Sequence, residues 1–217
     1  MVRNQQLSTK VRLKVPGFTL VELAIVLLVM GMIAGAIFKG QDLIESARIR
    51  SILNDFNRFR LAVVMYQETY GMLPGDDNHA SAHFGGEVTN GNGNGIINYE
   101  EEQTFWQHLN KSGQLSSANP PTSKLGGRYK VVYQPTPQWP GHWLQLGKEN
   151  GSTLEGILTP KQAQLLKSKA EDNGNLNPTQ GAIRFMEGAG VPKGQCVQGD
   201  HLNLEVDAPV CVVLAAF

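Results

Sequence analysis

An uninterrupted apolar segment near the start of the chain, residues 18–38, constrains its fold more than any other feature. It contains a single charged side chain, that of Glu22. A helix rises about 1.5 Å per residue, so this segment can cross the roughly 30 Å hydrocarbon core of a membrane. We therefore expect one membrane-spanning helix here, followed by a separate and more polar domain.

Four basic side chains and no acidic one precede the apolar segment, at Arg3, Lys10, Arg12 and Lys14. Because basic residues flanking a membrane helix stay on the cytoplasmic side, residues 1–17 are predicted to be cytoplasmic and the later residues to lie outside. A secretory signal would have a shorter apolar run followed by a small-residue cleavage site. Without residues 1–17 the chain is mildly acidic, which argues against nucleic-acid binding through diffuse positive charge.

Glu22 is unusual because it lies only about one helical turn into the apolar run. A carboxylate in hydrocarbon is costly unless it is paired. One explanation is a glutamate near the membrane surface whose side chain reaches water. The other is a compensating charge supplied by another polypeptide.

The sequence GFTLVE at residues 17–22, with its basic leader and following apolar run, resembles the cleavage and methylation signature of type IV pilins and type II secretion pseudopilins. The resemblance implies cleavage after Gly17 by a prepilin peptidase, N-methylation of Phe18 and an assembly role for Glu22. In a filament, Glu22 of one subunit would pair with the Phe18 ammonium of a neighbour. That pairing would compensate two charges inside an apolar bundle.

Two features bear on the subtype. Many major pilins carry a proline near the end of the apolar segment, where this chain has Lys39. Gly31 and Gly35 have the GxxxG spacing that permits close helix approach, although they are equally explained as ordinary glycines of a membrane helix. The missing proline and the long polar portion favour a minor pilin or a pseudopilin, whereas the C-terminal loop bounded by two cysteines favours a pilin.

An amphipathic pattern continues beyond the apolar run. Apolar residues recur at spacings of three and four as far as Tyr70, and Gly71 and Pro74 then end the pattern. We predict one helix over residues 18–70 and a head domain over residues 71–217. Further helices are expected at residues 98–112 and after Thr159. Strands are expected at residues 128–134, 142–146, 182–185, 202–206 and 210–214. The expected fold is α+β, with the long helix packed on a small antiparallel β-sheet, as the resemblance also implies.

The head contains the two cysteines of the chain, Cys196 and Cys211. If the head is exported, a disulfide between them is expected, and two reduced thiols are the alternative. In the chain-entropy model this loop would contribute about 3 kcal/mol. A zinc site is disfavoured because no second cysteine pair exists.

The repeated Asn-Gly sequence at residues 90–95 overlays a calcium-binding loop of the EF-hand type. In that alignment Gly95 makes the turn, and the candidate oxygen ligands come from Asn90, Asn92, Asn94, the Ile96 carbonyl and Glu101. Amide oxygens are neutral, so binding would be weak unless Asp76 and Asp77 fold over the loop and add charge. The competing interpretation is a plain turn followed by a capping box between Asn98 and Glu101.

No motif for catalysis is present, and we expect no enzymatic activity. The spacing of His79 and His83 suits a transition metal, but loop histidines without a metal explain them as well. The resemblance implies a single-pass protein of a bacterial inner membrane that joins a periplasmic or extracellular filament. Its partners would be other pilin or pseudopilin subunits, the prepilin peptidase and an inner-membrane assembly platform. The alternative is a membrane-anchored binding module, such as a calcium-dependent adhesin or a DNA-uptake receptor.

Overall fold

The computed structural model describes residues 17–134, 139–151, 153–171 and 174–217, apart from the side chain of Phe38. The predicted basic leader therefore lies outside the described residues, except for Gly17. The chain divides into two compact units, Met1–Ile44 and Glu45–Phe217. Each unit is described by itself below.

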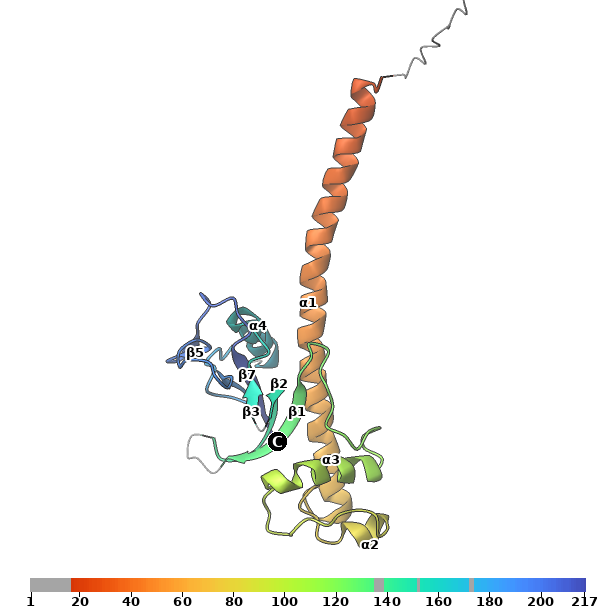
Figure 1. Cartoon of the computed structure of the whole chain (residues 1–217), viewed down its shortest axis with the longest axis vertical. Helices are drawn as coiled ribbons and strands as arrows, with labels where there is room; N and C mark the ends of the chain where they lie inside the picture. The colour runs from red at the N-terminus through yellow and green to blue at the C-terminus, as the bar shows by residue number, and fades with distance from the viewer. Residues whose placement is uncertain (1–16, 135–138, 152, 172–173) are drawn as a thin grey trace, which may run out of the picture. The chain divides into compact units, whose positions relative to one another are not determined.

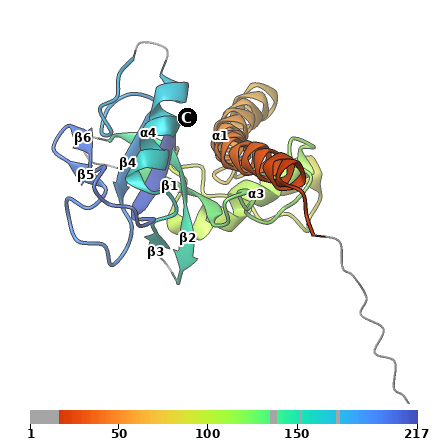
Figure 2. The ribbon, with the colours of Figure 1, turned by 90° about the horizontal axis from the view of Figure 1, so that it is seen from above.

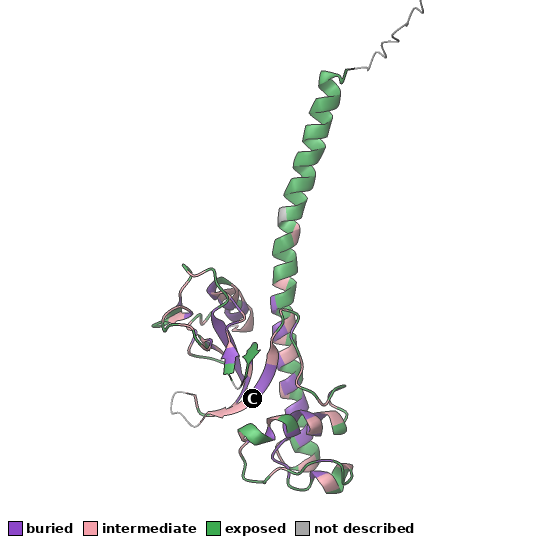
Figure 3. Ribbon diagram, viewed as in Figure 1, coloured by how far each residue is buried: buried purple, intermediate pink, exposed green. Residues whose placement is uncertain are grey.

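The predicted long helix is confirmed as α1, which runs from Leu20 to Tyr70 (Figure 1). Its residues 20–44 belong to the first unit, where nearly every apolar side chain is exposed (Figure 3). By length and composition α1 is able to cross a membrane. The helix ends where the nitrogen of Gly71 donates to the carbonyl of Gln67, and Gly71 has the positive φ that favours glycine at this position.

Residues 45–70 of α1 form one wall of the hydrophobic core of the second unit. Their buried side chains recur at the predicted spacings of three and four: Ile49, Ile52, Phe56, Phe59, Ala62, Val63 and Tyr66. The ring of Phe59 packs edge-on against Tyr129 and Trp106, with centroids 4.9 and 5.4 Å away. The same helix therefore exposes nearly all apolar side chains in its first half and buries one apolar face in its second.

The other wall of this core is an antiparallel sheet with the strand order β1-β2-β7-β4. The strands are β1 (Arg128–Gln134), β2 (Gly141–Asn150), β7 (Cys211–Ala216) and β4 (Ile183–Glu187). The short strand β3 (Thr153–Glu155) pairs with the end of β2. A separate hairpin consists of β5 (Val197–Gln198) and β6 (His201–Leu202). The expected α+β fold is thus confirmed.

One predicted strand is wrong. In the segment 202–206 only Leu202 is extended, as part of the short strand His201–Leu202, because the chain turns at Asn203. The Asn203 side chain donates to the carbonyl of Gly194, and the nitrogen of Val206 returns to the carbonyl of Asn203. These bonds use backbone groups that a longer strand would need.

Three helices complete the head: α2 (Ala80–Phe84), α3 (Glu102–Lys111), which follows a 3₁₀ turn at Tyr99–Glu101, and α4 (Pro160–Ala170). Helix α2 lies in a segment for which the sequence predicted no helix. Helix α4 begins with a capping box in which Thr159 and Gln162 each accept the other's backbone N–H. Ala163 and Leu166 of α4 join the core. Figure 2 shows α4 beside β4.

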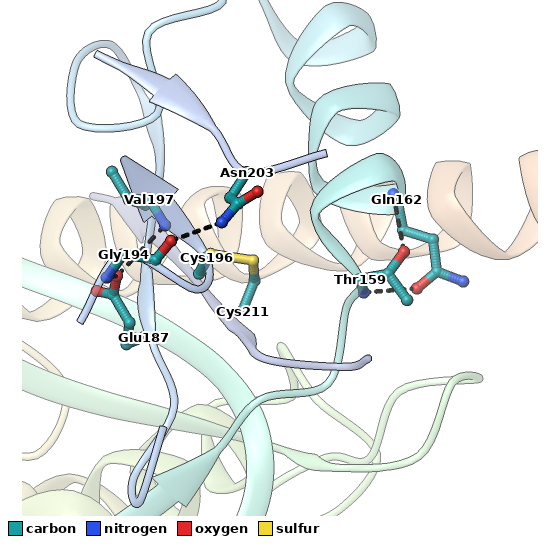
Figure 4. Close-up of a disulfide and its surroundings, with 8 residues drawn as sticks. All are labelled: Thr159, Gln162, Glu187, Gly194, Cys196, Val197, Asn203 and Cys211. Carbon is teal, nitrogen blue, oxygen red and sulfur yellow. Dashed lines mark hydrogen bonds between the residues drawn. A yellow bond between two sulfur atoms is a disulfide. The ribbon is translucent and has the colours of Figure 1, made fainter. Parts of the chain in front are cut away.

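The predicted disulfide between Cys196 and Cys211 is confirmed and is fully buried (Figure 4). It joins the β5–β6 hairpin to the first residue of β7. Cys211 also exchanges backbone hydrogen bonds with Leu158, just before α4. The carboxylate of Glu187 accepts from the nitrogens of Gly194 and Val197 and holds the same hairpin.

Replacing both cysteines by serine should therefore loosen the hairpin and lower the free energy of unfolding by about 3 kcal/mol. Chemical denaturation of oxidised and reduced wild-type protein should give a difference of the same size. Equal stability of the oxidised and reduced forms would contradict this account of the hairpin.

Candidate functional site

At the start of α1, Glu22 has partners within its own chain. One of its carboxylate oxygens accepts hydrogen bonds from both the backbone nitrogen and the hydroxyl of Thr19, each at 2.8 Å. The Thr19 hydroxyl in turn accepts from the nitrogen of Glu22 at 3.2 Å. This reciprocal arrangement is a capping box, which satisfies backbone donors that a helix start leaves free. The pattern threonine-x-x-glutamate in the sequence could have revealed it.

The two predicted processing residues lie immediately before this cap. Phe18 is 78% exposed. A β-carbon added to Gly17 would have no neighbouring atom within 4 Å, and the same holds at Gly31 and Gly35. Packing inside this unit therefore does not require glycine at any of the three positions. If glycine is needed there, the reason lies in a partner such as a peptidase or a second helix.

In the head, the Asn-Gly loop (residues 90–95) wraps around the segment that carries Asp76. The buried Asp76 carboxylate accepts from the nitrogens of Asn94 and Gly95, at 2.9 and 2.8 Å. The nitrogens of Gly91 and Gly93 donate to the backbone carbonyls of Asp77 and Asp76, at 2.8 and 2.9 Å. Asp76 thus reaches the loop, as the sequence suggested it could.

Every candidate side-chain calcium ligand is engaged by a backbone N–H. Asn90 accepts from Ser81, Asn92 from Asn94, and Asn94 from Ile96. The two oxygens of Glu101 accept from Asn92 and Asn98, and the predicted capping box is confirmed. Within the described residues no three acidic, histidine or cysteine side chains form a metal-binding group. Asn90 accepts its bond from outside the loop, and the Asp76 carboxylate lies against the loop.

Calcium binding stays a prediction, and a melting experiment tests it. If the loop binds calcium, millimolar calcium should raise the melting temperature of the protein relative to a chelator, because a ligand that binds only the folded state stabilises it. Asp76→Asn removes the charged oxygen nearest the loop and should abolish the increase. The same melting temperature in calcium and in chelator would show that the loop does not bind calcium and that Asp76 serves only as a hydrogen-bond acceptor.

Two histidines that no sequence motif marks stabilise the same region, because their neutral rings accept hydrogen bonds from its backbone. His108 of α3 is fully buried, accepts at Nδ1 from the nitrogen of Gly75 at 2.9 Å, and reaches the carbonyl of Thr89 through Nε2 at 2.8 Å. His142 of β2 accepts at Nε2 from the nitrogen of Ile97 at 3.1 Å. Burial lowers the pKa of both rings, and the charges of Asp77 near His108 and Asp76 near His142 only partly oppose it.

These depressed pKa values predict a stability that falls in acid. An unfolded histidine titrates near 6.5, above the pKa of the folded ring, so the unfolded chain binds more protons at low pH. The contribution of these two histidines to the free energy of unfolding should be complete above pH 6.5 and should decrease as the pH falls below it. His108→Asn keeps an acceptor near Gly75 but cannot titrate, so its decline should be shallower. An identical pH dependence in the variant would contradict this assignment.

His83, one of the two histidines whose spacing suits a transition metal, contacts a buried carboxylate. His83 lies 3.3 Å from Asp77, whose carboxylate also accepts from the Tyr66 hydroxyl and from the nitrogen of His79. Asp77 is buried, and it anchors the chain just after α1. His79 therefore meets Asp77 through its backbone rather than through its ring.

A cavity of about 330 Å³ lies between residues 96–99 and the edge strand β1. Ile97 and Val131 form apolar parts of its lining, and Glu102 and Lys130 are its charged residues. Burial raises the pKa of Glu102. Among the lining residues, no serine, cysteine, threonine or histidine is available for nucleophilic catalysis.

Comparison with known proteins identifies the N-terminal segment. Residues 12–38 match the family model of the prokaryotic N-terminal methylation motif. No curated protein matches the sequence. Among solved structures, the chain is similar to the major type IV pilin PilA1 from Clostridium difficile, with 18% identity over 79% of this chain and 95% of that one. The TM-score of this match is 0.39.

Proposed function

We propose that this chain, whose residues 12–38 match the prokaryotic N-terminal methylation motif, is a structural subunit of a type IV pilus-like or type II secretion filament. The observation that carries the proposal is the methylation motif at residues 12–38 joined to a helix whose apolar side chains are exposed over residues 20–44. A helix that is apolar on all sides requires a membrane or a bundle of other helices around it. A filament subunit meets both in succession.

In this proposal the subunit is first stored in the inner membrane with residues 1–17 in the cytoplasm. A prepilin peptidase then cleaves after Gly17, and the new amino group of Phe18 is methylated. The assembly platform extracts the subunit into a filament of pilin or pseudopilin subunits. The absence of proline at Lys39 and the size of the head support a minor pilin or a pseudopilin.

The Thr19–Glu22 capping box supplies a physical step for assembly. In the uncleaved chain the nitrogen of Phe18 is a neutral amide, and Glu22 bonds to the neighbouring Thr19. Cleavage converts that nitrogen into an ammonium group and creates a charge next to Thr19. Cleavage therefore makes the first turn of α1 a paired-charge site, in which the Glu22 of one subunit meets the ammonium of another.

The capping role and the pairing role can be separated by mutation. Glu22→Ala leaves the ammonium unpaired in an apolar bundle, a loss of roughly 3–5 kcal/mol, and should greatly reduce filament yield. Thr19→Val removes the hydroxyl of the cap but keeps the carboxylate, a loss of about 1 kcal/mol, and should leave filaments largely intact. Filament yield is measured by shearing and quantifying fibres, and cleavage is measured from the size of the membrane-bound subunit.

Both variants should still be cleaved. Gly17→Ala, which the packing of this unit tolerates, should stay at the full length and thereby serves as the uncleaved reference. Wild-type filament levels from Glu22→Ala would refute the pairing of Glu22 with the Phe18 ammonium. Equal losses of filament yield from Glu22→Ala and Thr19→Val would show that Glu22 acts only as a helix cap.

A further inference from the structure

Asparagine followed by glycine is a chemically labile sequence, and this chain contains it at residues 90–91, 92–93, 94–95, 150–151 and 173–174. The backbone nitrogen of the glycine attacks the side-chain carbonyl carbon of the asparagine and expels ammonia, which forms a cyclic succinimide. Water then opens the ring to aspartate or isoaspartate. Glycine permits the attack because it lacks a β-carbon and its backbone is mobile. Asn173 lies outside the described residues.

In the Asn-Gly loop, each attacking nitrogen already donates a hydrogen bond. The nitrogens of Gly91 and Gly93 donate to backbone carbonyls, and the nitrogen of Gly95 donates to the Asp76 carboxylate. An amide nitrogen must lose its proton to attack, and donation to an acceptor opposes that loss. The asparagine side chains are also fixed: Asn92 and Asn94 each accept from the nitrogen two residues ahead.

The fold explains why glycine is needed beside these asparagines. A β-carbon on Gly91 would lie 2.2 Å from the carbonyl oxygen of Gly75, and one on Gly93 would lie 2.6 Å from the amide of Asn78. Gly93 and Gly95 also have positive φ. The loop therefore cannot replace these glycines with bulkier residues that would slow the reaction.

The turn between β2 and β3 offers a direct contrast. Asn150 is exposed, and Gly151 follows it at a positive φ of 60°. Within the part of the chain that the structure describes, the nitrogen of Gly151 has no hydrogen-bond acceptor. The amide nitrogen of Asn150 donates to Glu155 and its backbone carbonyl accepts from Thr153, but neither contact protects the attacking nitrogen.

From these contacts we infer that Asn150 is a deamidation site of the native protein, and that Asn90, Asn92 and Asn94 become deamidation sites only when the Asn-Gly loop opens. The same sequence thus has two fates, set by whether the glycine nitrogen donates to a fixed acceptor. The inference does not depend on the filament proposal, because it concerns the chemistry of the folded head.

Deamidation in the loop would also prevent it from closing again. The nitrogen of Asn94 donates to both Asp76 and Asn92, so these two side-chain oxygens share one donor. An aspartate at position 92 would place a second carboxylate beside the buried one of Asp76. Two carboxylates that accept from the same nitrogen lie close together, and like charges this close repel strongly in a partly buried site. A single opening followed by reaction would therefore leave a permanent change.

The test measures deamidation at each asparagine in the full-length protein in detergent micelles, by peptide mass spectrometry with separation of aspartate and isoaspartate. In the native protein, Asn150 should react at least about tenfold faster than Asn90, Asn92 or Asn94, since each of these must wait for local opening. In denaturant the four rates should converge. Loop rates equal to that of Asn150 in the native protein would overturn the inference, as would rates that stay apart in denaturant.

A variant sharpens the test. Asp76→Ala removes the acceptor of the Gly95 nitrogen but leaves the backbone carbonyl that Gly91 uses, so Asn94 should accelerate more than Asn90. Asp207→Ala, which removes an exposed carboxylate paired with Lys161, should change neither rate. An unchanged rate at Asn94 in Asp76→Ala would overturn the inference. If that variant does not fold, the comparison of native and denatured wild-type protein decides.

Discussion

A single helix has to satisfy two environments, and this constraint governs the rest of the structure. Over residues 20–44 of α1 the apolar side chains are exposed, whereas over residues 45–70 those on one face are buried in the head and others, such as Leu61 and Val64, stay exposed. The first half is stable only if a membrane or other helices surround it. The second half already has its partner in the sheet. The head thus buries its own apolar core, whereas residues 20–44 of α1 need a membrane or other helices to cover their apolar side chains.

The head is organised differently, around buried acceptors that hold backbone N–H groups. Asp76, Glu101 and His108 are buried and His142 is partly buried, and each accepts such a bond from the segment between α1 and the 3₁₀ turn. That segment contains little regular structure, so side chains supply partners that a helix or strand would otherwise provide. The Asn-Gly repeat requires glycine because Gly91 passes close to Gly75 and because Gly93 and Gly95 have positive φ.

The sequence was sufficient to predict features that depend on local pattern. The extent of α1, the position of β1, the capped start of α4 and the pairing of Cys196 with Cys211 all follow from periodicity, punctuation or composition. Features set by contacts between distant segments could not be predicted. The extended segment predicted after Leu202 is broken by the bond from Asn203 to Gly194, and neither His108 nor His142 is marked by any motif.

The candidate sites divide in the same way. The GFTLVE signature is local, and a family model matches it. The role of Glu22 as a cap could have been predicted from its spacing to Thr19. In the Asn-Gly loop, the alignment assigned the first position to Asn90, whereas in the folded protein the charged oxygens nearest the loop come from Asp76, which is distant in sequence. The sequence suggested that Asp76 could reach the loop, and the tertiary structure sets which backbone nitrogens it accepts from.

We propose that this chain matures at the junction of Gly17 and Phe18 into a filament subunit. The most direct measurement is the mass and N-terminal sequence of the protein purified from membranes or sheared fibres. The account predicts a chain that begins with Phe18 and carries one methyl group on its amine. A mature protein that retains residues 1–17, or that begins at another residue, would contradict it.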